Sequence, residues 1–289
     1  MRALVIGASG QIGAAVVTQL TARGHAVVGT HGRVPQPGTR PLDLRDATAT
    51  ADLVEASAAD WVFCPGGLTH VDYCEDHRDE AFRVNRDGAA VAARAAAKRG
   101  AGFVYYSTEY IFDGLRGPYT EDDPARPMSV YGESKLAGER TAVAENARTL
   151  VVRTTVVYGP EPQGKNFVYQ LVRRLRSGER MRVPTDQVSS PSYNVDVAAA
   201  SVELAERGLT GVFNIAGRHL LDRHAFARLA CDVFALDGAL LEPVATAELN
   251  QRAARPLRAG LRIDRIQSTL SYEPRSPDGG LRAMRRAIG

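Results

Sequence analysis

Cysteine is scarce in this sequence, which has only Cys64, Cys74 and Cys231 among 289 residues. The three form no CxxC pair and have no histidine nearby at the spacing of a zinc site. The pattern therefore argues against both a disulfide framework and a structural zinc site. We expect buried or idle thiols in a reducing compartment, and so a cytoplasmic protein.

Long apolar runs and an excess of charge of one sign are also missing. No stretch approaches the ~18 consecutive apolar residues of a membrane-spanning helix, and a glycine turn follows the N-terminus too soon for a signal peptide. The 36 Lys and Arg are scattered among 33 Asp and Glu, for a net charge of +3. We therefore expect neither a membrane nor a nucleic acid among the partners of this protein.

Glycine, in contrast, follows a pattern near the start of the chain. Gly7, Gly10 and Gly13 lie between an apolar run over 2–6 and a segment over 12–20 with apolar residues at helical spacing. In a turn between a strand and a helix, such glycines let backbone N–H groups and the helix N-terminus meet a pyrophosphate. The motif predicts a dinucleotide site, and a tight turn that serves only helix–strand packing is the alternative.

Strand-like and helix-like segments alternate along the first half of the chain. The alternation predicts an α/β fold with a doubly wound parallel sheet of the Rossmann type, covered by helices on both faces. We expect a nucleotide-binding domain over 1–160 and a smaller substrate-binding lobe over 161–289, interwoven with the first. Ligands of such sheets bind at the carboxyl ends of the strands, where Gly7, Thr108 and Thr155 fall. The expected strands are 2–6, 26–29, 61–64, 103–107, 150–157 and 212–215, with a short one starting at 182, and the expected helices are 12–20, 79–99, one carrying Tyr131, 166–176 and 195–207.

A tyrosine and a lysine one helical turn apart, Tyr131 and Lys135, follow Thr108 at the end of an apolar run. A free tyrosine has a pKa of about 10 and is a poor proton shuttle at neutral pH. A nearby ammonium favours the phenolate and lowers that pKa, so the pair predicts a proton donor and its activator. With Thr108 as a carbonyl anchor, the pattern indicates hydride transfer at a carbon that bears oxygen. The alternative is that Tyr131 and Lys135 are only surface neighbours on a helix.

The preferred cofactor is indicated by a missing carboxylate. NAD sites usually place Asp or Glu about 20 residues past the glycines, on the ribose 2′-OH. The corresponding strand end here runs from Gly29 to Arg33 and has no acid. Arg33 can instead meet a 2′-phosphate, assisted by His31 or Thr30, which predicts NADPH over NADH. A solvated loop residue is the alternative for Arg33.

Longer segments along nearly the whole chain match a known family. They are 7–13, Thr69-His-Val-Asp72, Val84-Asn85, 107–114, 131–139, Arg153-Thr-Thr155, Asp186-Gln187 and Arg255-Pro256 leading into Leu261. On these segments the chain resembles the extended short-chain dehydrogenase/reductases, and within them the branch that contains dTDP-4-dehydrorhamnose reductase.

The resemblance implies an NADPH-dependent reductase of a 4-keto-6-deoxy nucleotide sugar. Tyr131 would protonate the C4 oxygen while hydride reaches the carbon, and Lys135 would also hydrogen-bond the nicotinamide ribose. A homodimer is left open. The residues implied for NADP are Gly7, Ser9, Gly10, Gln11, Ile12, Gly13, His31, Arg33, Asp43, Leu44, Tyr131 and Lys135, those for the substrate are Thr69, Val71, Asp72, Glu109 and Arg255, and the catalytic ones are Thr108, Tyr131 and Lys135. A helix cap is the alternative for Asp72.

The chain also departs from the pattern of that branch. Glu109 stands where an aspartate usually follows the catalytic threonine. Ala14-Ala15 replaces the acid through which some of those reductases bind a dimer-bridging magnesium, so we expect no metal site. Val156 replaces a tryptophan near the sugar, and Gly66-Gly67 replaces small alanines. The sugar can therefore differ from dTDP-4-dehydrorhamnose.

Two other functions stay open. A nucleotide-sugar epimerase uses the same tyrosine and lysine with tightly held NAD, and the missing acid after the second strand counts against it. A non-catalytic NADP-binding subunit that regulates a partner enzyme occurs in a related branch, and the intact Thr108, Tyr131 and Lys135 favour catalysis instead. A dehydratase would carry an Asp-Glu pair after its threonine, whereas Glu109-Tyr110 supplies one carboxylate.

Overall fold

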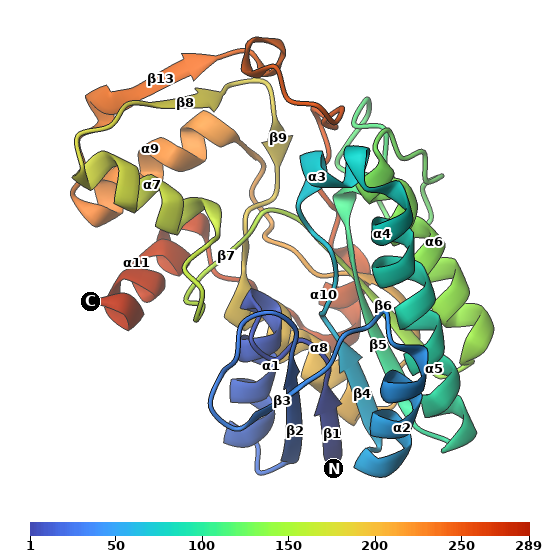
Figure 1. Ribbon diagram of the computed structural model, residues 1–289. Coiled ribbons are helices and arrows are strands. Elements are labelled where there is room, and N and C mark those ends of the chain that lie inside the picture. Colours follow the sequence, from blue (N-terminus) through green and yellow to red (C-terminus); the bar gives the residue numbers. More distant parts are fainter.

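A seven-stranded parallel sheet forms the centre of the computed structural model, which describes residues 1–289 (Figure 1). Its strand order is β11-β6-β5-β4-β1-β2-β3, so the strands that follow β1 are added first on one side and then on the other. Such a switch point opens a crevice for ligands beyond the carboxyl ends of β1 and β4. The strands are β1 (Arg2–Val5), β2 (Ala26–His31), β3 (Thr39–Pro41), β4 (Trp61–Cys64), β5 (Gly102–Thr108), β6 (Thr149–Thr154) and β11 (Gly211–Asn214).

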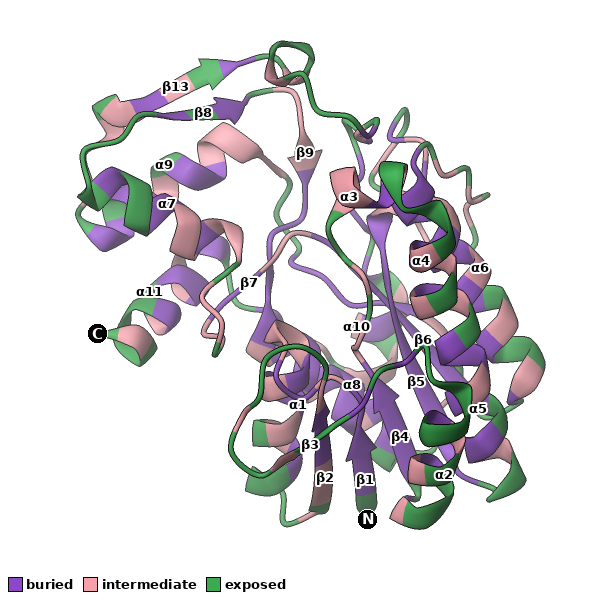
Figure 2. Cartoon of the chain, in the orientation of Figure 1, coloured by how far each residue is buried: buried purple, intermediate pink, exposed green.

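Helices cover both faces of this sheet because its strands are apolar on both sides. Ala3 and Val5 belong to a core shared with α1, α8 and α10, whereas Leu4 and Ile6 belong to a core shared with α2 and α5. Figure 2 shows buried strands and helices whose outer faces are exposed. The predicted fold class is confirmed. The covering helices are α1 (Gln11–Ala22), α2 (Ala47–Ser57), α5 (Ala89–Lys98), α6 (Val130–Glu145), α8 (Asn194–Glu206) and α10 (Asp264–Leu270).

The helix expected over 79–99 is not one regular helix. It consists of α4 (Arg78–Phe82), a π-helical turn η1 (Arg83–Gly88) and α5. At η1, the Asn85 carbonyl accepts a hydrogen bond from the Tyr105 hydroxyl at 2.8 Å, and the Asn85 side chain pairs with the backbone of Leu68. These contacts to distant segments favour the wider turn, which a periodic sequence pattern does not reveal.

The strand expected over 150–157 also ends early. β6 stops at Thr154, and Val156 has a φ of +41°. A β-branched residue rarely adopts this left-handed conformation, so the chain is turned sharply out of the sheet here. The next two residues form β7 (Val157–Tyr158), which pairs with β10 (Ser192–Tyr193) in a separate two-stranded sheet.

A smaller group of elements lies beyond the carboxyl ends of the large sheet, with its own core around Leu171, Phe226 and Leu281 (Figure 1). Between them the chain returns to the large sheet as α8 and β11. The domain division at residue 160 stays a prediction. None of the helices is long and apolar enough to cross a membrane. The remaining elements are α3 (Val71–Asp76), α7 (Phe167–Arg176), β8 (Met181–Pro184), β9 (Val188–Ser189), β12 (Leu221–Asp222), α9 (Arg223–Phe234), β13 (Leu241–Val244), α11 (Pro277–Ile288) and 3₁₀ turns at Glu109–Ile111, Gly238–Leu240 and Thr246–Leu249.

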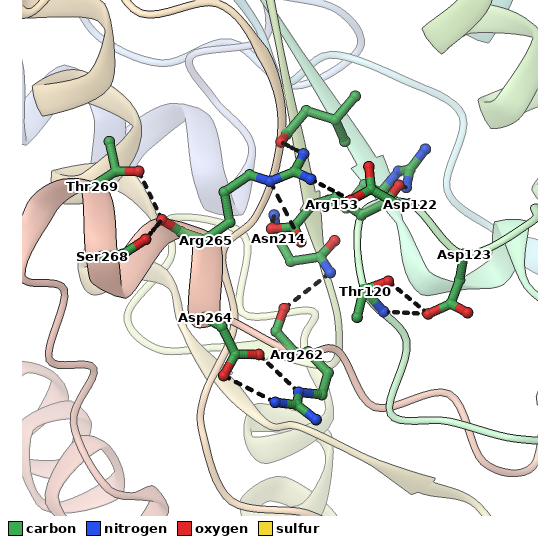
Figure 3. Close-up of polar contacts among 12 residues, drawn as sticks. Thr120, Asp122, Asp123, Arg153, Asn214, Arg262, Asp264, Arg265, Ser268 and Thr269 are labelled. Atoms are coloured by element: carbon green, nitrogen blue, oxygen red, sulfur yellow. Dashed lines mark hydrogen bonds and ion pairs between the residues drawn. The ribbon is translucent and has the colours of Figure 1, made fainter.

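Polar contacts tie the loop after β5 to the last strand and helix of the large layer (Figure 3). Arg265 in α10 donates to the Val212 carbonyl at 3.0 Å and pairs with Asp122 at 2.6 Å. The Asn214 amide in β11 donates to the carbonyls of Tyr119 and Arg262, each at 3.0 Å. These contacts fix the position of the edge strand β11 relative to the loop that leads toward Tyr131.

Candidate active site

The glycine turn between β1 and α1 has no room for a side chain at Gly7 or Gly13. Gly7 has a φ of +92°, and a Cβ there would lie 2.7 Å from the Gly66 Cα. A Cβ on Gly13 would lie 2.1 Å from the Gly7 carbonyl oxygen, so α1 starts in direct contact with the turn. The N-terminus of α1 therefore lies directly at the carboxyl end of β1, a geometry that fits the pyrophosphate of a dinucleotide.

Replacing Gly13 by alanine is expected to weaken both folding and cofactor binding. The new methyl group cannot fit 2.1 Å from a carbonyl oxygen, so α1 must shift, and overpacking of this kind costs about 1–3 kcal/mol. Urea unfolding and NADPH fluorescence titration measure the two effects. Gly238→Ala is the matched control, because no atom lies within 4 Å of a Cβ there. Equal results for the two variants would contradict the close packing.

Two of the other residues predicted at this turn, Ser9 and Gln11, contact β7 and the segment after it. The Gln11 side chain donates to the Val157 carbonyl at 3.0 Å, and Gln163 donates to the Ser9 carbonyl at 2.8 Å. Ile12 packs against the core of the large sheet. These contacts leave the backbone, rather than the Gln11 amide, as the part of the turn that can meet a phosphate.

Charged side chains gather at the carboxyl ends of β2 and β3. Arg33 is four-fifths exposed and lies 3.4 Å from Glu80, while Arg45 lies 3.2 Å from the same Glu80 oxygen. Arg45 also pairs with Asp43 at 2.6 Å, and this hydrogen bond lowers the pKa of Asp43. His31, predicted to assist Arg33, bonds Thr39 instead at 2.7 Å. Leu44 is buried. The sequence reasoning missed Arg45, although it directly follows the predicted Asp43-Leu44, and Glu80, for which no motif gives a signal.

Tyr131 and Lys135 lie on the first turns of α6, at the carboxyl edge of the sheet. The Ser129 hydroxyl caps this helix by accepting from the Gly132 N–H, and Glu75 accepts the Val130 N–H at 2.9 Å. A Cβ on Gly132 would lie 2.2 Å from the Tyr110 carbonyl oxygen, so α6 packs directly on the turn after Thr108. The structure therefore places all three predicted catalytic residues in one region.

Burial controls the ionisation of the tyrosine and the lysine. It raises the pKa of Tyr131, an effect that Glu109 reinforces and the Thr108 hydroxyl opposes. Burial also lowers the pKa of Lys135 to about 8. The expected lowering of the Tyr131 pKa is not found in the protein alone, because desolvation is the largest effect. The phenol thus stays protonated at neutral pH, as a proton donor requires.

The space beside Lys135 depends on a glycine of the segment after β4. The Lys135 ammonium lies 4.3 Å from the centroid of the Tyr105 ring. A Cβ on Gly67 would lie 3.7 Å from the Lys135 Nζ and 2.9 Å from Asn85 Oδ1. Asn85, which also holds Ser134 at 2.9 Å, is a site residue that the sequence reasoning did not assign. Gly67 therefore lets this segment pass close to Asn85 and the lysine.

The predicted substrate residues come from segments far apart in the chain. Asp72 accepts from Arg255 at 2.7 Å and from the Ala253 N–H at 3.0 Å, whereas His70 caps α3, so the helix-cap alternative for Asp72 is wrong. Arg255 is nine-tenths buried, its Nη1 has no partner, and it lies over the Tyr110 ring. Val71 packs against the cluster that contains Tyr131, and Thr69 is exposed beside it. Their roles toward a substrate stay predictions.

Comparison with known proteins identifies the family. A family model described as the RmlD substrate-binding domain matches residues 1–287. The chain belongs to this family. It is 32% identical over 295 residues to the probable low-salt glycan biosynthesis reductase Agl14 of Haloferax volcanii, covering 100% of this chain and 98% of that protein. It is 33% identical over 280 residues to the dTDP-4-dehydrorhamnose reductase of Sinorhizobium fredii, covering 93% and 91%.

A solved structure supports the same assignment. The dTDP-4-dehydrorhamnose reductase of Bacillus anthracis, in complex with NADP, superimposes with a TM-score of 0.92 at 26% identity and covers 99% of both chains. The predicted resemblance to the dTDP-4-dehydrorhamnose reductase branch is thereby confirmed.

Proposed function

We propose that this protein is an NADPH-dependent reductase that converts the C4 carbonyl of a 4-keto-6-deoxy nucleotide sugar to a hydroxyl. The observation that carries the proposal is the gathering of Thr108, Tyr131 and Lys135 beside the glycine turn, in a member of the RmlD family. The reductases among its relatives and the NADP bound to one of them support the predicted reaction class and cofactor.

The residues of the site have separate roles in this reaction. NADPH, when bound, supplies the hydride. Tyr131 holds the proton that passes to the substrate oxygen, and Thr108 positions that oxygen by a hydrogen bond. The Lys135 ammonium stabilises the negative charge that Tyr131 acquires when it gives up its proton. Burial of all three side chains excludes water from the reacting atoms.

The first experiment follows NADPH oxidation by absorbance with dTDP-, UDP- and GDP-linked 4-keto-6-deoxysugars. We expect turnover with one nucleotide class. Tight NADPH binding without turnover on any of them would contradict the proposal and favour a regulatory NADP-binding subunit. Comparing the amount of NADPH oxidised with the amount of sugar product measured by NMR distinguishes a reductase from an epimerase. Only the reductase consumes one NADPH for each product molecule.

Arg33 and Arg45 are proposed to bind the 2′-phosphate of NADPH together. Replacing either one by methionine is expected to raise the KM for NADPH about 10–100-fold, because a hydrogen bond to a charged group contributes about 1.5–3 kcal/mol. The KM for NADH, which lacks this phosphate, should stay the same. Steady-state kinetics with both cofactors provide the check, and an equal change for NADH would exclude a phosphate-specific role.

A homodimer and a cytoplasmic location also belong to this proposal. Sedimentation velocity of the purified protein tests the first, and fractionation of the producing cells tests the second.

A further inference from the structure

Glu109 is buried at the carboxyl end of β5, with only 6% of the residue exposed. Its Oε2 lies 2.8 Å from the Thr108 hydroxyl oxygen, and the Tyr110 N–H donates to the same Thr108 oxygen at 3.3 Å. Both partners belong to the turn that directly follows Thr108. The hydroxyl expected to position the substrate is therefore already engaged by two groups of the turn that follows it, and it also faces the Tyr131 hydroxyl.

The bonding capacity of this hydroxyl decides what it can do next. A threonine hydroxyl has one hydrogen to donate and two lone pairs that accept, and the Tyr110 N–H takes one lone pair. An ionised Glu109 can only accept, so it takes the hydrogen and leaves Thr108 nothing to donate. A protonated Glu109 donates to the second lone pair, and the Thr108 hydrogen stays free. A substrate carbonyl oxygen only accepts, so Thr108 can bind it in the second state alone.

We propose that Glu109 works as a neutral carboxylic acid, which donates to Thr108 Oγ1 and so directs the Thr108 hydrogen toward the substrate carbonyl oxygen. The inference rests on the proposed reductase function. Glu109 is then a positioning residue that acts through Thr108 and keeps its own proton, while Tyr131 supplies the proton that ends on the substrate. A neutral Glu109 also keeps a negative charge away from the oxygen that becomes negative in the transition state.

The surroundings of Glu109 favour the neutral form. Burial raises the pKa of Glu109 above its ordinary value, against the opposing hydrogen bond from Thr108 and the attraction of Arg223. Tyr131 faces it from α6 and Tyr110 from its own turn, and both are uncharged while they keep their protons. Arg223, the first residue of α9, is the cation that faces it. Because the pKa is raised, the neutral acid persists to a higher pH than usual and is lost as the pH rises through that value.

The protonation state can be measured without a sugar substrate. An infrared difference spectrum of the NADPH-bound wild type minus Glu109→Gln at neutral pH should contain the carbonyl stretch of a protonated carboxylic acid. This band should disappear on raising the pH. A spectrum with only carboxylate bands at neutral pH would overturn the proposal, whichever substrate the enzyme uses.

Kinetics of two variants test the effect on catalysis. Glu109→Gln keeps a donor to Thr108 and should lose no more than about tenfold in kcat. Glu109→Leu leaves the Thr108 hydroxyl without the group that orients it and should lose more than Glu109→Gln does. The alkaline loss of kcat that belongs to Glu109 should be absent in Glu109→Gln, while the titration of Lys135 remains in both proteins. Thermal melting and NADPH titration serve as controls that each variant folds and binds the cofactor.

Two results would contradict the positioning role: equal losses of kcat in Glu109→Gln and Glu109→Leu, or identical pH profiles of the wild type and Glu109→Gln. Failure of the wild type to reduce any sugar would instead count against the proposed function. The infrared spectrum would still decide the state of Glu109 in that case.

Discussion

Replacing Tyr131 by phenylalanine is expected to lower kcat for sugar reduction by about 10²–10⁴-fold, because proton transfer by a positioned group contributes that much. The substitution removes one oxygen and leaves a ring that packs edge-on against Tyr110, with centroids 5.5 Å apart. The cluster of Cys74, Ala81 and Val130 around the ring is equally undisturbed. Stability and NADPH affinity should therefore stay close to those of the wild type. Single-turnover NADPH oxidation measures the chemical step directly.

The control for this variant is Tyr169→Phe in α7, whose hydroxyl accepts only the Glu161 N–H at 3.4 Å. It should keep the kcat of the wild type. Unchanged turnover of Tyr131→Phe would show that another group protonates the substrate oxygen. A parallel loss of NADPH binding would show that the phenol contributes to the cofactor site rather than to proton transfer alone.

Much of the fold could be predicted from the sequence because local signals suffice for it. A strand buried on both faces is apolar at every position, so the bounds Trp61–Cys64 were predicted without error. Gly13 is required by a contact within the turn itself, because a Cβ there would lie 2.1 Å from the Gly7 carbonyl oxygen, although Gly7 also faces the distant Gly66. Helices α7 and α8 begin and end within one residue of their predicted bounds, since the apolar periodicity lies inside each segment and Asn166 caps α7.

The features that sequence patterns did not reveal depend on contacts between distant segments. The left-handed Val156 ends β6 early, because the following residues pair with β10 rather than with the large sheet. The π-helical turn at Asn85 forms where Leu68 and Tyr105 bind it. A valine or an asparagine carries no local signal for either conformation.

The same distinction applies to the site. Thr108, Tyr131 and Lys135 could be assigned from short motifs at strand and helix ends. The pairing of Asp72 with Arg255 joins residues 183 positions apart, and the burial of Glu109 becomes evident only when α6 and α9 are in place. A place in the substrate site could be predicted for these side chains from their motifs. Their contact partners, and therefore their ionisation, could not be predicted.

Replacing Glu139 by alanine is expected to cost about 3–5 kcal/mol in the free energy of unfolding, the usual effect of leaving a buried charge without its partner. Glu139 in α6 and Arg153 in β6 are both more than nine-tenths buried and are joined by bonds of 2.7 Å and 3.0 Å. Arg153 also donates to the Glu121 carbonyl at 3.0 Å and cannot turn away to solvent. Urea unfolding followed by circular dichroism measures the loss.

The same helix provides a matched control, Glu145→Ala. Glu145 pairs with Arg94 at 2.7 Å, but Arg94 is more than half exposed, and exposed pairs contribute about 0–1 kcal/mol. The double replacement Glu139→Leu with Arg153→Met should recover most of the loss, since apolar side chains of similar volume substitute well for a buried ion pair. Equal costs for Glu139→Ala and Glu145→Ala would contradict the burial of the pair.

Lys135 lies one turn before Glu139 in α6. Glu139→Ala should therefore also lower kcat, even when the assay temperature is well below the melting temperature of the variant. The double variant should restore both the stability and kcat.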